Sequence, residues 1–228
     1  MVRQELIDTN IKLITFDAPK GNLLSFEDIV FFSDMISKEE ENTLVKGVII
    51  TGTNQSFCTG LKVDSALKEK DLLFKEFDIL LYKLFSFSKP LIAAVNGHSI
   101  GGGLLFQLCA DYVVMSQNRK IKIGLPELKL NTVLDDLMIN VLEYSIGNFR
   151  LIQKLIYSGH YIQPEESLNY TLSDDIVAES DLMSISLDKM KKLISYNLNV
   201  FKTMKLNMRR NTTKKMSENL RCKCYEIF

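Results

Sequence analysis

The sequence has no excess of charge of either sign, no long apolar run and no cysteine framework. Lysine and arginine number 28, as do aspartate and glutamate, so no global field would attract nucleic acid or a membrane surface. No apolar run approaches the roughly 20 residues that a membrane-spanning helix needs. The first ten residues show no apolar segment behind a basic one, so we expect no signal peptide. The four cysteines indicate reduced thiols in a cytoplasmic protein.

The length of 228 residues fits one domain with a substantial core. Internal repeats, low-complexity segments and linkers are lacking. We therefore expect a single domain over residues 1–228, with a mixed core to about residue 180 and a helical region from about 181 to 228.

Short apolar runs separated by amphipathic segments predict an alternating α/β chain. Strands are expected at 2–7, 11–16, 45–51, 91–95, 112–115 and 175–178, with Ile121 and Ile123 continuing the same sheet. Helices are expected from a Ser25 cap through Ile36 and at 71–86, 104–109, 134–144, 149–157, 164–170, 182–198 and 214–225. This order of strand, helix and strand implies right-handed parallel crossovers.

Residues 90–111 are interpreted as the centre of the fold and as a site for an anionic oxygen. The apolar residues 91–95 suit a strand buried on both faces, and Gly101, Gly102 and Gly103 precede a run with the apolar density of a buried helix. Glycines at such a junction let another group approach bare amide N–H groups. Free N–H groups at a helix start stabilise a negative oxygen. We interpret the junction as one half of an oxyanion hole.

A second loop offers backbone amides in the same way. The strand at 45–51 leads into a small-residue segment at 56–64 that contains Gly60. The glycine triplet itself is not a phosphate loop, because no Gly-Lys-Ser/Thr follows it.

Three motifs, in this order, resemble those of the crotonase superfamily of enoyl-CoA hydratases and isomerases. They are Phe57-Cys58-Thr59-Gly60-Leu61, the segment 96–103 and Pro126-Glu127. The resemblance covers about residues 5–210. It implies an α/β fold, a spiral of ββα units with a C-terminal helical region that builds homotrimers or hexamers. It also implies an acyl-CoA substrate, with coenzyme A as part of that substrate, no further cofactor and no metal.

Carried over by position, the resemblance makes the amides of Leu61 and Gly102 the donors to a thioester enolate and Glu127 the catalytic carboxylate. Hydratases have a second glutamate where this sequence has Leu105. The resemblance therefore argues against hydration and is greatest to the Δ3-Δ2 enoyl-CoA isomerases, in which one base moves a proton from C2 to C4. The apolar neighbours of Glu127 predict a raised pKa, as a working base needs.

Asp135 resembles a third position that several relatives use. Aspartate stands there in dienoyl-CoA isomerases and in 3-hydroxyisobutyryl-CoA hydrolases, so Asp135 is expected either to assist Glu127 or to form a thioester hydrolase with it. Beside Asp136, it equally fits a charge at a helix N-terminus. A further hypothesis is a catalytically silent protein that binds CoA esters.

The resemblance also implies a set of substrate-binding residues: Lys20, Cys58, Gly60, Lys62, His98, Gly101, Gly103 and Leu105. Lys20 and Lys62 flank the region where the family binds the nucleotide of CoA, although each also fits a solvated charge. His98 resembles a residue of the polyketide β-branching decarboxylases and equally fits a loop residue that hydrogen-bonds locally.

Overall fold

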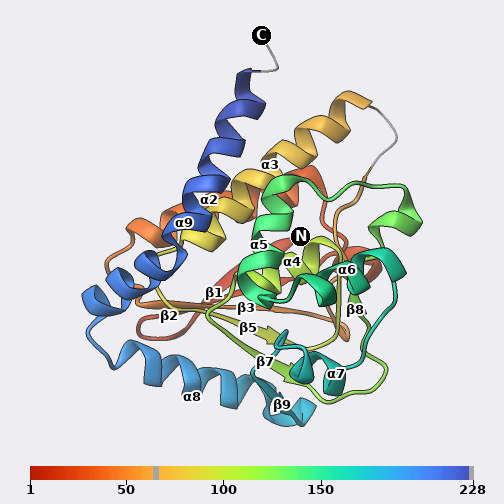
Figure 1. Cartoon of the computed structure of the whole chain (residues 1–228). Helices are drawn as coiled ribbons and strands as arrows, with labels where there is room; N and C mark the ends of the chain where they lie inside the picture. The colour runs from red at the N-terminus through yellow and green to blue at the C-terminus, as the bar shows by residue number, and fades with distance from the viewer. Residues whose placement is uncertain (64–66, 226–228) are drawn as a thin grey trace.

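The computed structural model describes residues 1–63 and 67–225 and arranges the strands in two sheets (Figure 1). The larger sheet contains, in spatial order, β1 (Val2–Asp8), β2 (Ile11–Phe16), β3 (Gly47–Gly52), β5 (Leu91–Val95), β7 (Tyr112–Ser116) and β9 (Asp175–Val177). The smaller sheet contains β4 (Ser56–Cys58), β6 (His98–Ile100) and β8 (Ile123–Gly124). β1 and β2 pair antiparallel, and the other strand pairs are parallel.

Successive strand pairs contribute one strand to each sheet. β3 and β4 are followed by α3 (Leu67–Ser86), and β5 and β6 by α4 (Gly102–Cys109). β7 and β8 are followed by the 3₁₀ turn η1 (Glu127–Leu130) and α5 (Asp136–Ile146). This repeated ββα order confirms the predicted fold class.

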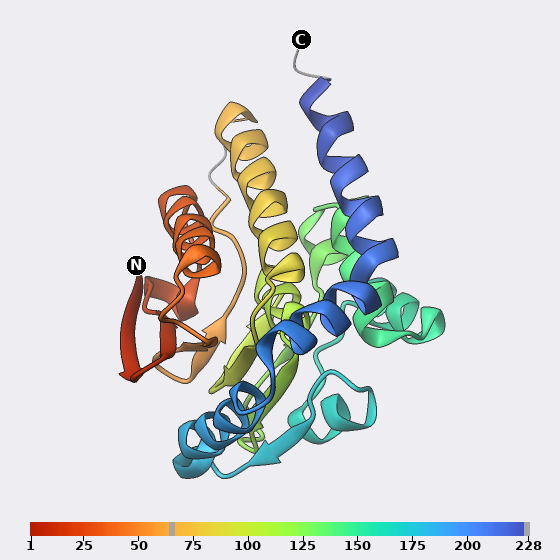
Figure 2. The same ribbon diagram turned by 90° about the vertical axis from the view of Figure 1, so that its left-hand side faces the viewer.

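Helices cover both faces of the larger sheet (Figure 1). α2 (Phe26–Glu41), α3, α4 and α5 enclose the main core, and α8 (Leu182–Ile194) covers the opposite face. The remaining helices are α1 (Pro19–Asn22), α6 (Phe149–Ser158), α7 (Pro164–Asn169), η2 (Glu179–Asp181) and α9 (Leu198–Tyr225). In Figure 2, α9 rises beside α3, and the two helices are in contact.

The position of β5 between two hydrophobic clusters explains why its sequence is apolar throughout. Leu91, Ala93 and Val95 belong to the main core, whereas Ile92 and Ala94 belong to the cluster beneath α8. All five residues are fully buried, which confirms the prediction of a strand covered on both faces.

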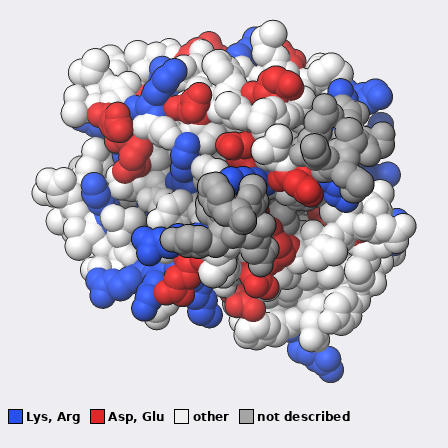
Figure 3. All heavy atoms as spheres, turned by 90° about the horizontal axis from the view of Figure 1, so that it is seen from above, with Lys and Arg blue, Asp and Glu red and all other residues white. Residues whose placement is uncertain are grey.

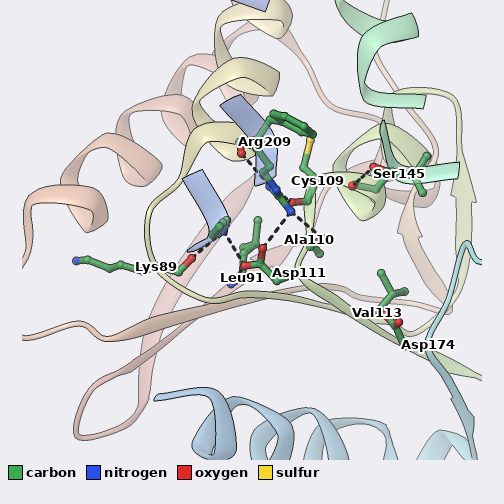
Figure 4. Close-up of polar contacts among 12 residues, drawn as sticks. Lys89, Leu91, Cys109, Ala110, Asp111, Val113, Ser145, Asp174 and Arg209 are labelled. Atoms are coloured by element: carbon green, nitrogen blue, oxygen red, sulfur yellow. Dashed lines mark hydrogen bonds and ion pairs between the residues drawn. The ribbon is translucent and has the colours of Figure 1, made fainter. Parts of the chain in front are cut away.

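The last helix is anchored by buried charges (Figure 4). Arg209 donates to Phe85 O at 2.8 Å and to Asp111 Oδ1 at 3.0 Å. Lys205 Nζ donates to Asp111 Oδ2 at 2.6 Å, and Leu91 N donates to the same oxygen at 2.9 Å. Burial lowers the pKa of Lys205 to about 8, and the nearby Asp111 carboxylate opposes that shift. α9 is thereby tied to the start of β5 and the end of α4.

Three predicted elements are wrong in extent or place. The helix expected at 182–198 ends at Ile194, and α9 begins at Leu198, not at 214. The break has a local cause, because Asn197 Oδ1 accepts hydrogen bonds from the backbone of Asn199 and Val200 and so starts a new helix. Ile123 belongs to the smaller sheet, not to the larger one.

Charge, helix hydrophobicity and cysteine exposure can be compared with the expectations from the sequence. Basic and acidic side chains are interspersed on the face seen in Figure 3. Within residues 1–63 and 67–225, no helix is both long and apolar enough to cross a membrane. Cys58 and Cys109 are buried thiols, and Cys222 is exposed.

Candidate active site

A pocket of about 290 Å³ lies where the smaller sheet meets the start of α4. Backbone of two glycine loops forms one side, at Gly60, Leu61, Gly101 and Gly102. Most of the remaining lining is apolar, with Phe74, Phe77, Leu105, Leu134 and Met138 among the residues that contribute. Glu127 also lines the pocket.

The amide of Leu61 is directed by a short parallel bridge to Leu24. Leu24 N donates to Gly60 O at 3.0 Å, and Lys62 N donates to Leu24 O at 2.7 Å. In a parallel pair, the residue between two such bonds points its own N–H to the opposite side. The N–H of Leu61 therefore points away from Leu24, and it has no acceptor among the residues that the structure describes.

The amide of Gly102 is free for a different reason, because it opens a helix. The first N–H groups of a helix have no partner within it, and Gly101 supplies no side-chain cap. Gly102 N lies 3.6 Å from the position that a Cβ of Gly60 would occupy. Only a methyl group would therefore fit between the two loops, and both candidate donors border one pocket.

The Glu127 carboxyl lies next to this junction. The residue is 9 % exposed, and its Oε2 has no hydrogen-bond partner among the described residues. Burial raises its pKa from 4.5 to about 7, as its apolar neighbours predict. Glu127 Oε1 lies 2.9 Å from where a Cβ of Gly101 would stand. Gly101 has a φ of +57°, which favours glycine, and a Cβ there would also displace the Glu127 carboxylate.

Leu105 and Asp135 differ in their relation to the pocket. Leu105 is 1 % exposed and lines it, so an aliphatic side chain and not an acid borders the pocket at this position. Asp135 is the N-cap of α5, and its Oδ1 accepts a hydrogen bond from Met138 N at 2.9 Å. Its neighbours Leu134 and Met138 line the pocket, whereas Asp135 itself is absent from the described lining.

Cys58 and Gly103 pack the site but lie outside the described lining of the pocket. A Cβ on Gly103 would come within 2.0 Å of Cys58 O, so the glycine allows α4 to lie directly on β4. Burial raises the pKa of the Cys58 thiol to about 12, which leaves it neutral. Both residues therefore position the loops.

Three other predicted substrate-binding residues also lie outside the described lining. His98 Nδ1 accepts a hydrogen bond from Lys122 N at 3.0 Å, and burial lowers the pKa of the ring. Lys20 and Lys62 are exposed. Lys20 lies next to the pocket, since its carbonyl accepts a hydrogen bond from the lining residue Thr59.

Sequence reasoning missed several residues of the pocket wall. Thr132, Val133 and Tyr161 line it although none belongs to a motif or to a strongly periodic segment. The sequence pattern placed Phe77 only on the apolar face of a predicted helix. Its ring lies 3.0 Å from the Cβ position of Gly102, so it shields one candidate donor from water.

A larger hollow of about 650 Å³ lies elsewhere, between α4, α5 and α9. Asp111, Lys205 and Arg209 line it, and these side chains are engaged with one another. Groups of three or more metal-ligating side chains are not found in the part of the chain that the structure describes. The smaller pocket is therefore the candidate active site.

Comparison with known proteins decides the family. The sequence model of the enoyl-CoA hydratase/isomerase family matches residues 7–224. The chain belongs to this family. It is thus a crotonase-superfamily protein, of a family that acts on acyl-CoA substrates.

Individual members of the enoyl-CoA hydratase/isomerase family share this fold at low identity. A carnitinyl-CoA dehydratase of Salmonella typhi is 27 % identical over 186 residues, which is 80 % of this chain and 70 % of the relative. The human mitochondrial delta3-delta2-enoyl-CoA isomerase superposes with a TM-score of 0.91 at 24 % identity, covering 99 % of this chain and 89 % of that one. An enoyl-CoA hydratase from Bacillus halodurans gives a TM-score of 0.86 at 20 % identity, covering 97 % and 91 %.

Proposed function

We propose that this protein is an enoyl-CoA isomerase that moves a double bond from position 3 to position 2 of an acyl thioester. The observation that carries the proposal is the Glu127 carboxyl, which is buried and whose Oε2 has no hydrogen-bond partner in the described residues. It borders a pocket with two free backbone amides, and Leu105 stands where hydratases have their second acid.

The chemistry follows from these groups. The thioester oxygen accepts hydrogen bonds from Leu61 N–H and Gly102 N–H, each worth about 2.7–4 kcal/mol in the transition state. Ionised Glu127 removes a proton from C2, and the electron pair moves to the thioester oxygen to form a dienolate. The protonated Glu127 then returns the proton to C4, so the double bond ends between C2 and C3. The apolar wall of Phe77, Leu134 and Met138 keeps water from the intermediate.

Two other activities fit the site less well. Dehydration, which the name of the Salmonella relative suggests, uses a second carboxylate in hydratase-type sites, and Leu105 cannot supply one. A thioester hydrolase would use Glu127 with Asp135, but the Asp135 carboxylate caps α5.

The test compares the wild type with Glu127→Gln and Asp135→Asn on a 3-enoyl-CoA. Glu127→Gln should reduce turnover by about 10²–10⁴-fold while binding of acetoacetyl-CoA persists. Asp135→Asn keeps a good N-cap residue and should retain isomerisation. Equal turnover in wild type and Glu127→Gln would remove the proposed base. Thiol release that Asp135→Asn abolishes would identify a hydrolase, and CoA-ester binding without turnover of any ester would identify a silent binder.

A further inference from the structure

The segment 18–24 lies beside the first glycine loop of the candidate active site, and its backbone is unusual. Lys20, Gly21 and Asn22 are consecutive residues with φ of +56°, +78° and +61°. Residues other than glycine rarely adopt this left-handed conformation, and consecutive ones are rarer still. Such a backbone persists only where the surrounding contacts fix it, and it is most frequent at functional sites. The contacts that hold this segment therefore bear on the site beside it.

Asn22 fastens the segment to β4 and to the turn before it. The residue is 1 % exposed. Its side-chain amide donates to Ser56 O at 2.7 Å, and to Thr53 O and Phe57 O at 3.3 Å each. Its Oδ1 accepts a hydrogen bond from Ala18 N at 2.9 Å. A buried side chain whose donor and acceptor groups are both engaged specifies one position of the turn relative to the strand.

Two hydroxyl groups hold the same turn from the side of the glycine loop. Ser56 Oγ donates to Gly21 O at 2.7 Å, and Thr59 Oγ1 donates to Lys20 O at 3.3 Å. The left-handed residues are thus bound by side chains of the segment that leads to Leu61.

The fixed turn leads directly to the residue that directs the Leu61 amide. Leu24 follows Asn22 by two residues, and its N–H donates to Gly60 O at 3.0 Å. In a trans peptide unit, the C=O and the N–H point in opposite directions. The carbonyl of Gly60 and the N–H of Leu61 belong to one such unit, so the position of Leu24 determines where the Leu61 N–H points.

We propose that Asn22 is a positioning residue of the oxyanion hole, which acts through Leu24 on the Leu61 amide. The inference rests on the proposed function, because this amide matters to turnover only if a thioester oxygen binds it. Asn22 lies outside the described lining of the pocket, so it would act without contact with the substrate. A displacement of about 1 Å at a catalytic group can reduce a rate by about 10²-fold, so release of the turn has a measurable effect.

The experiment uses Asn22→Gly, which removes the amide and keeps a residue that tolerates a positive φ. For a 3-enoyl-CoA, kcat should fall at least about tenfold and KM should change less than about twofold, since an oxyanion donor acts mainly in the transition state. The second readout is the carbonyl stretch of a bound saturated acyl-CoA, measured by isotope-edited infrared spectroscopy. It should lie below that of the free ester in the wild type and return part of the way in the variant, because the Gly102 amide remains.

Asn54→Gly is the matched control, because Asn54 has a φ of +53° but an exposed side chain. It should leave kcat and the carbonyl stretch unchanged. Ser56→Ala removes the hydrogen bond to Gly21 O and changes the core less. It should shift both readouts in the direction expected for Asn22→Gly, and it decides the question if that variant does not fold.

Wild-type kcat and carbonyl stretch in folded Asn22→Gly overturn the inference, and so does the same result in Ser56→Ala where Asn22→Gly does not fold. A loss of kcat with an unchanged carbonyl stretch also overturns it, because the loss would then have another structural cause. In each case the proposed isomerase stands. A wild type that binds the ester without lowering its carbonyl stretch would overturn the proposed function together with this inference.

Discussion

The protonation of Glu127 links the stability of the protein to its proposed chemistry. Because burial raises its pKa from 4.5 to about 7, the folded chain holds this proton more tightly than the unfolded chain does. The resulting stabilisation is present below pH 4.5 and is lost as the pH rises through about 7. Ionised Glu127, the form that acts as the base, therefore lowers the free energy of unfolding.

Glu127→Gln should therefore stabilise the protein at high pH. The shift corresponds to about 3 kcal/mol. We expect the variant to raise the free energy of unfolding by roughly that amount near pH 8, and to change it little near pH 4, in urea titrations. The wild-type kcat/KM for a 3-enoyl-CoA should rise with pH and level off above about 7. A gain in stability that is equal at both pH values would contradict a buried acid with a raised pKa.

At this scale the sequence predicted the central residues but not all their surroundings. The resemblance of the motifs to those of the family pointed to Leu61, Gly102 and Glu127, and all three border the pocket. The same motifs also suggested His98 and Lys62, and neither lies in the described lining of the pocket. Whether a side chain faces a cavity depends on contacts with distant segments, such as the bond from Lys122 N to His98.

The junction of β4 and α4 depends on close backbone packing. Gly103 lets the helix approach Cys58 to a distance at which no Cβ fits. The position of α4 in turn sets the direction of the Gly102 amide, because both residues belong to its first turn. The geometry of the site is therefore decided by how this helix lies on the smaller sheet.

Gly103→Ala should displace α4 and reduce turnover at least tenfold, with a loss of stability of about 3 kcal/mol or more. Gly147→Ala is the matched control, since Gly147 has a φ of +65° but no atom within 4 Å of its Cβ position. That variant should cost about 1 kcal/mol and leave kcat unchanged. Thermal unfolding and 3-enoyl-CoA turnover check both expectations, and equal turnover in the two variants would refute the role of the packing.

Element prediction succeeded where the apolar pattern was strong and failed where pairing is distant. β5 was predicted within its observed bounds, because five consecutive apolar residues leave few alternatives. β6 is not among the predicted strands, since His98–Ile100 is a strand only through its partners β4 and β8. The first half of α9 is not among the predicted helices, and it is held in place by contacts with distant segments through Lys205 and Arg209, which are both buried.

Across the whole molecule, the Asp111 carboxylate joins the last helix to the central sheet. It accepts hydrogen bonds from Lys205, Arg209 and Leu91 N, which lie far apart in the sequence. Removing one partner from a buried group of charges leaves the others uncompensated, which is far more costly than the group's net contribution.

Asp111→Asn should lower the free energy of unfolding by about 3–5 kcal/mol. Glu218→Gln breaks an exposed pair with Lys214 on the same helix and should change it by less than about 1 kcal/mol. Urea unfolding of the two variants side by side measures the difference. Similar small losses in both would mean that α9 is not held by the Asp111 carboxylate. The predicted homotrimer stays a prediction.

The short bridge between Leu24 and Leu61 has a practical consequence for mutagenesis. It aims a main-chain group, so the proposed grip on the thioester oxygen does not depend on which side chain stands at position 61. An alanine scan would not reveal this role, because truncation of the Leu61 side chain leaves the amide in place. Only a change to the main chain would remove the Leu61 N–H. Replacing this amide by an ester would show how much its hydrogen bond to the thioester oxygen contributes to turnover.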